Sequence, residues 1–139
     1  MKKLEDRRMT IYFGDLTHTS LTISNDSFPL NIGYVAAYLH KYYPDIEVEL
    51  FKYPEDLKQA IDKKTPDILA LSNYPWNVDL HASFFEYVKD IDKDVITVMG
   101  GPNMSYDRQS QDSFINTYKE SLDFYTILEG ERTFKELID

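Results

Sequence analysis

The run DILALS at residues 67–72 is the strongest indication of fold class in this sequence. After its first residue it stays apolar with no polar alternation. That pattern is typical of a central strand in a parallel sheet whose two faces are both covered by helices. A second run of this kind, VITVM at residues 95–99, follows after a segment of helical period. The two runs therefore predict the buried centre of a parallel sheet.

Outward from this centre, short apolar runs alternate with helical periods along the whole chain. Three further strands are expected, at residues 10–14, 46–51 and 124–128, and the second of them alternates apolar with acidic residues as an edge strand does. The first expected helix begins at Pro29. Four later helices are expected where apolar residues recur at helical spacing: at Leu57, Ala60 and Ile61, at Leu80, Phe84, Val88 and Ile91, in residues 113–122, and at Phe134, Leu137 and Ile138. The sequence predicts an α/β three-layer sandwich of Rossmann-like, flavodoxin-like type, with strand order 2-1-3-4-5.

Composition restricts the classes of function. The 139 residues suit one domain, with residues 1–8 expected to form a flexible lead. A net charge of −9 offers no basic surface for nucleic acid, and no apolar run is long enough for a membrane span. There are no cysteines, which excludes disulfides, thiolate metal sites and a cysteine-held cluster in this chain and fits a cytoplasmic location.

Ligands of such sheets bind beyond the carboxyl ends of the strands, at the switch point between strands one and three. The candidate loops are residues 15–28, 73–77, 100–105 and 129–131. In the second loop and just before it, Ser72 and Asn73 offer a hydroxyl and an amide, and Tyr74 adds a flat apolar surface. These side chains could line a ligand site or form an aromatic lid over the core.

Each of the other three loops leaves two interpretations open. Gly100 and Gly101 end a buried strand, either as a bare turn or because a ligand lies against the backbone where a Cβ would clash. Glu129 and Glu131 flank a glycine, either as acidic residues at a helix start or as part of a site. His18 follows Asp15 by three residues and could be an oriented metal ligand or a solvated loop residue.

Four segments together resemble a known family. They are PLNIGYVAAYL at residues 29–39, PDILALSNY at 66–74, VMGGPNMS at 98–105 and EGERTFKEL at 129–137. In order and spacing they are similar to the cobalamin-binding domain that precedes the catalytic domain in cobalamin-dependent radical S-adenosylmethionine enzymes. The resemblance covers the chain from about Pro29 to its last residue.

This resemblance implies a cofactor site and assigns its residues. The nucleotide tail of cobalamin would enter between strands one and three, with the corrin ring on the carboxyl edge. The implied cofactor-binding residues are Ser72, Asn73, Tyr74, Gly100, Gly101, Pro102, Asn103, Glu129, Gly130 and Glu131. The last three match a Gly-Glu-Gly-Glu signature, although Leu128 stands at its first glycine.

Two departures from the family pattern refine these expectations. The Asp-x-His-x-x-Gly motif that supplies a histidine to cobalt is absent, because His18 is out of register and no glycine follows it. We therefore expect base-off cobalamin without a protein metal ligand. The family's Cys-x-x-x-Cys-x-x-Cys cluster motif is also absent, because the chain has no cysteine. The iron–sulfur cluster and S-adenosylmethionine would therefore belong to a downstream C-terminal radical catalytic domain of the methyltransferase type. On this interpretation the 139 residues are a fragment of a longer polypeptide and contain no complete active site.

The residue types at key positions distinguish between other classes of function. A phosphorylated receiver needs an acidic pair, an aspartate after strand three and a lysine after strand five, whereas Asp15, Ser72 and Glu129 stand there. The main alternative is a Rossmann-like interaction or regulatory domain that has lost cofactor binding. A flavin binder is a further alternative, and a hydrolase is disfavoured because no Gly-x-Ser-x-Gly motif is present.

Overall fold

The computed structural model describes residues 7–17 and 29–139. Its strands are β1 (Thr10–Gly14), β2 (Glu47–Phe51), β3 (Ile68–Ser72), β4 (Ile96–Gly100) and β5 (Phe124–Thr126). Its helices are α1 (Leu30–Tyr42), α2 (Pro54–Lys63), α3 (Val78–Ile91), α4 (Arg108–Tyr118) and α5 (Gly130–Ile138). None of the helices in these residues is long and apolar enough to cross a membrane.

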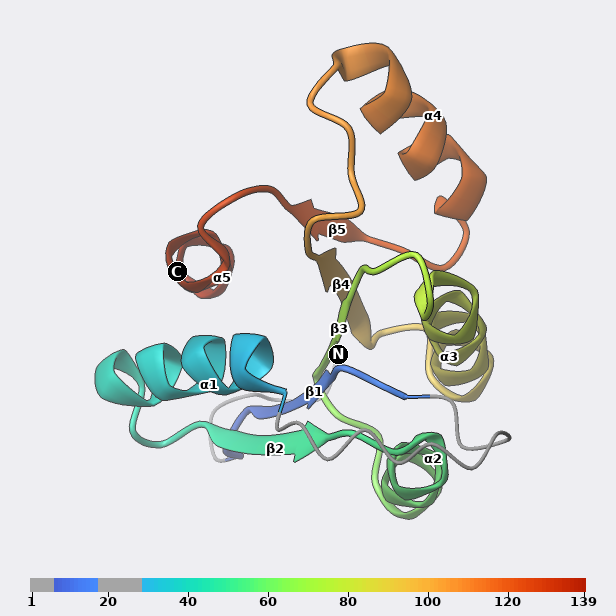
Figure 1. Ribbon diagram of the computed structural model, residues 1–139. Coiled ribbons are helices and arrows are strands. Elements are labelled where there is room, and N and C mark those ends of the chain that lie inside the picture. The colour runs from blue at the N-terminus through green and yellow to red at the C-terminus, as the bar shows by residue number, and fades with distance from the viewer. Residues whose placement is uncertain (1–6, 18–28) are drawn as a thin grey trace.

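The strands form one parallel sheet in the order β2-β1-β3-β4-β5, which confirms the predicted topology. Helices α1 and α5 lie side by side over one face of the sheet, and α2 and α3 cover the other (Figure 1). Helix α4 stands apart beyond the β5 edge, and none of its residues is buried. The molecule is the three-layer α/β sandwich that the alternation of strand and helix patterns predicted.

Two elements differ from the predicted boundaries. Helix α4 begins at Arg108 rather than near Ser113, because the Asp107 carboxylate caps it by accepting a hydrogen bond from the Ser110 N–H at 2.8 Å. Strand β5 ends at Thr126 rather than Leu128. Leu128 has φ of 64°, a left-handed conformation that extended pairing cannot include.

The two faces of the sheet differ in the size of their side chains. Residues facing α1 and α5 become small toward the carboxyl end, where Ala70 and Val98 are followed by Ser72, Gly100 and Thr126. The strand residues that alternate with these positions point to the opposite face, toward α2 and α3, and have large side chains, namely Tyr12, Leu69, Leu71, Met99 and Tyr125. Below we call these the α1/α5 face and the α2/α3 face.

Candidate functional site

A cavity of about 400 Å³ lies on the α1/α5 face at the carboxyl end of the sheet. Its floor includes one row of the sheet, in which Ser72 pairs with Gly100 and Gly100 pairs with Thr126. Ala70 and Val98 form the row behind it. The cavity exists because none of these side chains is large enough to fill the space beneath the helices.

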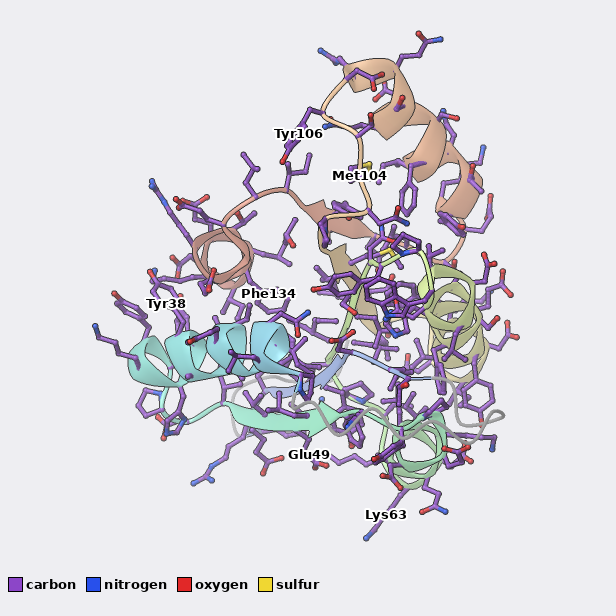
Figure 2. All side chains as sticks on the ribbon, in the orientation of Figure 1. Tyr38, Glu49, Lys63, Met104, Tyr106 and Phe134 are labelled. Atoms are coloured by element: carbon purple, nitrogen blue, oxygen red, sulfur yellow. The ribbon has the colours of Figure 1, made fainter. Side chains whose placement is uncertain are left out.

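Helices and loops complete the walls. Ile32 and Val35 contribute from α1, and Phe134 contributes from α5, where its ring contacts that of Phe13 with centroids 5.0 Å apart. Figure 2 shows Phe134 in the space between α5 and α1. The buried part of the wall is therefore hydrocarbon from both helices.

The mouth of the cavity is formed by two loops with exposed apolar side chains. Met104 and Tyr106 lie on the loop from β4 to α4, and Tyr106 projects towards the side on which α5 lies (Figure 2). Ile127 and Leu128 follow β5. Tyr106 is 81% exposed and Leu128 is 74% exposed, so the rim presents apolar surface to water.

The cavity brings together most of the residues that the sequence predicted. Seven of the ten line it: Ser72, Tyr74, Gly100, Gly101, Pro102, Gly130 and Glu131. Asn73, Asn103 and Glu129 do not. Whether these residues touch a ligand stays a prediction, but the shared location of the seven follows from the fold.

Asn73 is fully buried and holds the glycine loop instead of lining the cavity. Its amide donates to the Asn103 carbonyl at 2.9 Å and to the Tyr125 hydroxyl at 3.0 Å. The Asn103 amide donates back to Asn73 Oδ1 at 3.1 Å, and the Tyr125 hydroxyl donates to the Gly101 carbonyl at 2.9 Å. These bonds fix the path of the chain after β4.

The glycine pair is required by the protein itself. Gly101 has φ of 141°, and a Cβ there would lie 2.7 Å from the Asn73 carbonyl oxygen. At Gly100 a Cβ would collide with the Thr126 hydroxyl. Close approach of neighbouring strands therefore explains both glycines without a ligand, although both also line the cavity.

The switch point between β1 and β3 is filled by a buried polar network. Asp15 Oδ1 accepts from the Ser72 hydroxyl at 2.7 Å and from the Asn77 amide at 3.2 Å. His81 is fully buried; its Nε2 accepts from the Leu16 N–H at 3.1 Å, so Nδ1 donates to the Ser72 carbonyl at 2.6 Å. Among the described residues, the cavity is lined by parts of β1, β3, β4 and β5, and entry of the tail between strands one and three stays a prediction.

Tyr74 forms the other side of the mouth. Its hydroxyl accepts from the Asn31 amide at 3.1 Å, and its ring stacks on Trp76 with centroids 4.6 Å apart. Burial, and then the negative charge of Asp15, raises the pKa of Tyr74. The hydroxyl therefore stays protonated at neutral pH, and the stacked pair presents a flat apolar surface beside the cavity.

No group of three or more histidine and carboxylate side chains that could hold a metal occurs in residues 7–17 and 29–139. His18 and the hydroxyl-rich segment around it lie outside the described residues, as do the first six residues of the expected flexible lead. Both ring nitrogens of His81 are held in hydrogen bonds.

Several lining residues were missed from the sequence: Asn31, Ile32, Val35, Met104, Tyr106, Thr126, Ile127, Leu128 and Phe134. The floor did carry a signal. In ILALS and ITVMG, small residues occupy every second position near the carboxyl end, which places them on one face. The helix and loop residues carried none, because only the tertiary fold brings them over that face.

The strand order and the covering helices place the chain in the class of α/β sandwiches with flavodoxin-like topology, with a cavity at the carboxyl edge of the sheet. The profile of the B12 binding domain matches residues 18–138, most of the chain. The chain belongs to the B12-binding domain family. A search of curated protein sequences finds no match.

Solved structures show the same fold at 11% sequence identity. An orphan response regulator of H. pylori superposes with a TM-score of 0.65, covering 95% of this chain and 97% of that one. A novel cobalamin-binding protein from Desulfitobacterium hafniense DCB-2 gives 0.64, over 95% of this chain and 59% of that one. NtrX from Brucella abortus superposes with a TM-score of 0.62, covering 95% of this chain and 26% of that one. The chain thus spans only part of the last two proteins.

Proposed function

We propose that this chain is a cobalamin-binding module and that the cavity of the α1/α5 face takes the nucleotide tail of the cofactor. The observation that carries the proposal is the row of small side chains, Ser72, Gly100 and Thr126, that leaves this cavity open in a member of the B12-binding family. A volume of about 400 Å³ lies within the range of small-molecule sites, about 300–1,000 Å³. It suits the base and sugar of the tail and excludes the whole corrinoid.

The rim fits the remainder of the cofactor. Tyr106, Leu128 and Trp76 are 81%, 74% and 63% exposed, and each offers apolar or aromatic surface. A large flat macrocycle would cover such side chains and remove their apolar area from water. Ser72 would stand where the tail meets the polar switch point, because its hydroxyl keeps acceptor capacity after donating to Asp15.

We further propose that cobalamin binds base-off and without a protein ligand to cobalt. Insertion of the tail base into the cavity removes it from the metal, and His81 is held in other hydrogen bonds. When bound, the cofactor would supply cobalt–carbon chemistry such as methyl transfer. The residues of this chain would hold the tail and shield it from water. The catalytic partner that the resemblance supports is a C-terminal radical S-adenosylmethionine domain.

The test of cofactor binding is gel filtration of the purified chain after mixing with hydroxocobalamin. The protein is expected to elute red. Val98→Phe should lose the colour, because the ring would fill the cavity floor, whereas Val88→Phe overpacks the α2/α3 face and should keep it. Thermal unfolding of each variant shows that it is folded. Colourless wild-type protein would contradict the proposal and favour the alternative of a regulatory domain that has lost its cofactor.

The state of the cofactor is tested separately with cob(II)alamin. Its electron paramagnetic resonance spectrum shows splitting from an axial nitrogen when one is bound to cobalt. We expect that splitting to vanish on binding to the protein. Its persistence would contradict the base-off proposal and leave cofactor binding intact.

The proposed partner is tested by the reading frame that encodes the chain. A Cys-x-x-x-Cys-x-x-Cys motif after Asp139, or in a protein that co-purifies with this one, is expected. A full-length polypeptide and partners without such a cysteine triad would contradict the radical S-adenosylmethionine assignment.

A further inference from the structure

Most of the buried wall of the cavity is hydrocarbon. Phe13, Ile32, Ala70, Val98 and Phe134 line it, and each is no more than 6% exposed. Val98 occupies the middle of the floor, where the register places it between Ala70 and Phe124. A group that enters to this depth contacts carbon from the sheet and from both helices.

The polar side chains of the cavity already have partners within the protein. The Ser72 hydroxyl donates to Asp15, and the Thr126 hydroxyl donates to the Met99 carbonyl at 3.5 Å. The Asn31 amide donates to the Tyr74 hydroxyl. In the described residues, no buried side-chain nitrogen or oxygen lacks a hydrogen-bond partner. The buried polar side chains of the wall are therefore already paired within the protein, and what they still offer a ligand at depth is the remaining acceptor capacity of the Ser72 and Thr126 hydroxyls.

The composition of the wall determines which tail bases can be buried at a low cost in free energy. Corrinoids differ in the base at the end of the tail, which is a benzimidazole, a phenol or an adenine. Adenine carries an amino group and two ring nitrogens more than benzimidazole. Buried against the hydrocarbon part of this wall, these groups would lose their bonds to water and find few partners in exchange, and an unmade buried hydrogen bond costs free energy.

We infer that the cavity selects corrinoids whose tail base has a hydrocarbon edge and rejects those that carry adenine, with Val98 as a specificity-determining residue. The inference rests on the proposed function and goes beyond it, since it names the ligand subclass from the composition of the wall. The expected preference is about tenfold or more in dissociation constant.

The test compares four ligands on the wild-type chain by absorbance titration: cobalamin, its adenine analogue, its phenol analogue and cobinamide, which lacks the tail. We expect cobalamin and the phenol analogue to bind within about threefold of each other, and the adenine analogue about tenfold weaker or worse. Cobinamide should be weaker than cobalamin. Equal binding of the adenine analogue, or of cobinamide, would overturn the inference while cobalamin binding stands.

A matched pair of variants tests the residue. Val98→Thr places a hydroxyl in the floor at nearly constant volume and should reduce the preference for cobalamin over the adenine analogue. Val88→Thr makes the same change at a fully buried position of the α2/α3 face and should leave that ratio unchanged. An unchanged ratio in Val98→Thr would overturn the role of Val98. Failure of all four ligands to bind wild-type protein would instead defeat the proposed function itself.

Discussion

The two faces of this sheet share the same strands and the same registers, yet in the described residues they are filled differently at the carboxyl end, where a cavity lies over the α1/α5 face. On the α2/α3 face, Leu71 and Met99 pack against Phe85 and Val88 in one continuous core. One residue along the strands, Ser72 and Gly100 face the cavity. In a parallel sheet covered on both sides, side-chain size at alternate positions thus decides which face keeps room for a ligand.

The largest expected effect compares one phenylalanine from each face. Phe85→Ala should lower the free energy of unfolding by about 3–5 kcal/mol, because the ring is packed on all sides. Phe134→Ala should cost about 2 kcal/mol, since part of that ring already faces the cavity and loses fewer contacts. Urea unfolding measures both losses of stability, provided that the variants share the m-value of the wild type. Equal costs would break the distinction between a filled and a hollow face.

The next effect concerns the floor. Gly100→Ala should destabilise the protein by about 1–3 kcal/mol through its collision with the Thr126 hydroxyl. In a Thr126→Ala background the cost should shrink by about 1 kcal/mol or more, a coupling that a double-mutant cycle measures. Gly130→Ala is the control, because its Cβ would lie 3.6 Å from Val35 in ordinary contact. Additive costs at Gly100 and Thr126 would show that the hydroxyl is not what requires the glycine.

The α2/α3 face is also held by a charge at the start of β5. Burial alone would raise the pKa of Asp123, but hydrogen bonds from the Lys89 ammonium at 2.7 Å and from the Thr97 N–H at 2.9 Å lower it overall. A lowered folded-state pKa means that the stabilisation is present above the unfolded value of 3.8 and is lost as pH falls through the folded value.

Comparison with Asp123→Asn isolates this charge. The wild type should exceed the variant in stability at pH 7 by up to about 1 kcal/mol, because the carboxylate is partly exposed and screened. The difference should shrink as urea midpoints are measured at pH values falling below 3.8, and disappear once the pH is below the lowered folded-state pKa. A difference that persists undiminished in acid would assign the effect to shape and not to charge.

The smallest effect lies at the rim of the cavity. Leu128 holds a left-handed conformation, which costs a residue with a Cβ about 1–2 kcal/mol. Leu128→Gly should therefore stabilise the protein by up to about 1 kcal/mol after the entropy of glycine is subtracted. The same variant should retain less hydroxocobalamin, because an exposed apolar side chain at the mouth is lost. A less stable variant would contradict the strain argument.

Much of the fold followed from sequence because burial on both faces has a direct signature. The non-alternating runs ending at Ser72 and Met99 identified the central strands, and the acidic alternation of residues 46–51 identified an edge. The end of β5 was wrong because FYTIL is apolar throughout, and nothing local showed that Leu128 would turn left-handed. The start of α4 could have been predicted from Asp107, because aspartate is a favoured residue at the N-cap of a helix.

The site was predictable only in part. The ends of β3 and β4 and the segments that follow β3, β4 and β5 supplied seven lining residues because parallel strands end at one edge. The sequence could not show that Asn73 would hold Asn103, or that Thr126 stands opposite Gly100, since both facts depend on pairing across strands. The glycine pair illustrates the difference: the sequence left open a bare turn or a ligand against the backbone, and the structure shows the protein's own Asn73 backbone and Thr126 hydroxyl there.

The most direct test of the account is a methyl-resolved NMR titration of the chain with hydroxocobalamin. Methyl resonances of Ala70, Val98 and Ile32 on the α1/α5 face should shift as the cofactor is added. Those of Leu57 and Val88, buried beneath the α2/α3 face, should stay in place. Shifts confined to the α2/α3 face, or cofactor binding that leaves Ala70 and Val98 unmoved, would contradict the claim that the hollow face is the binding site.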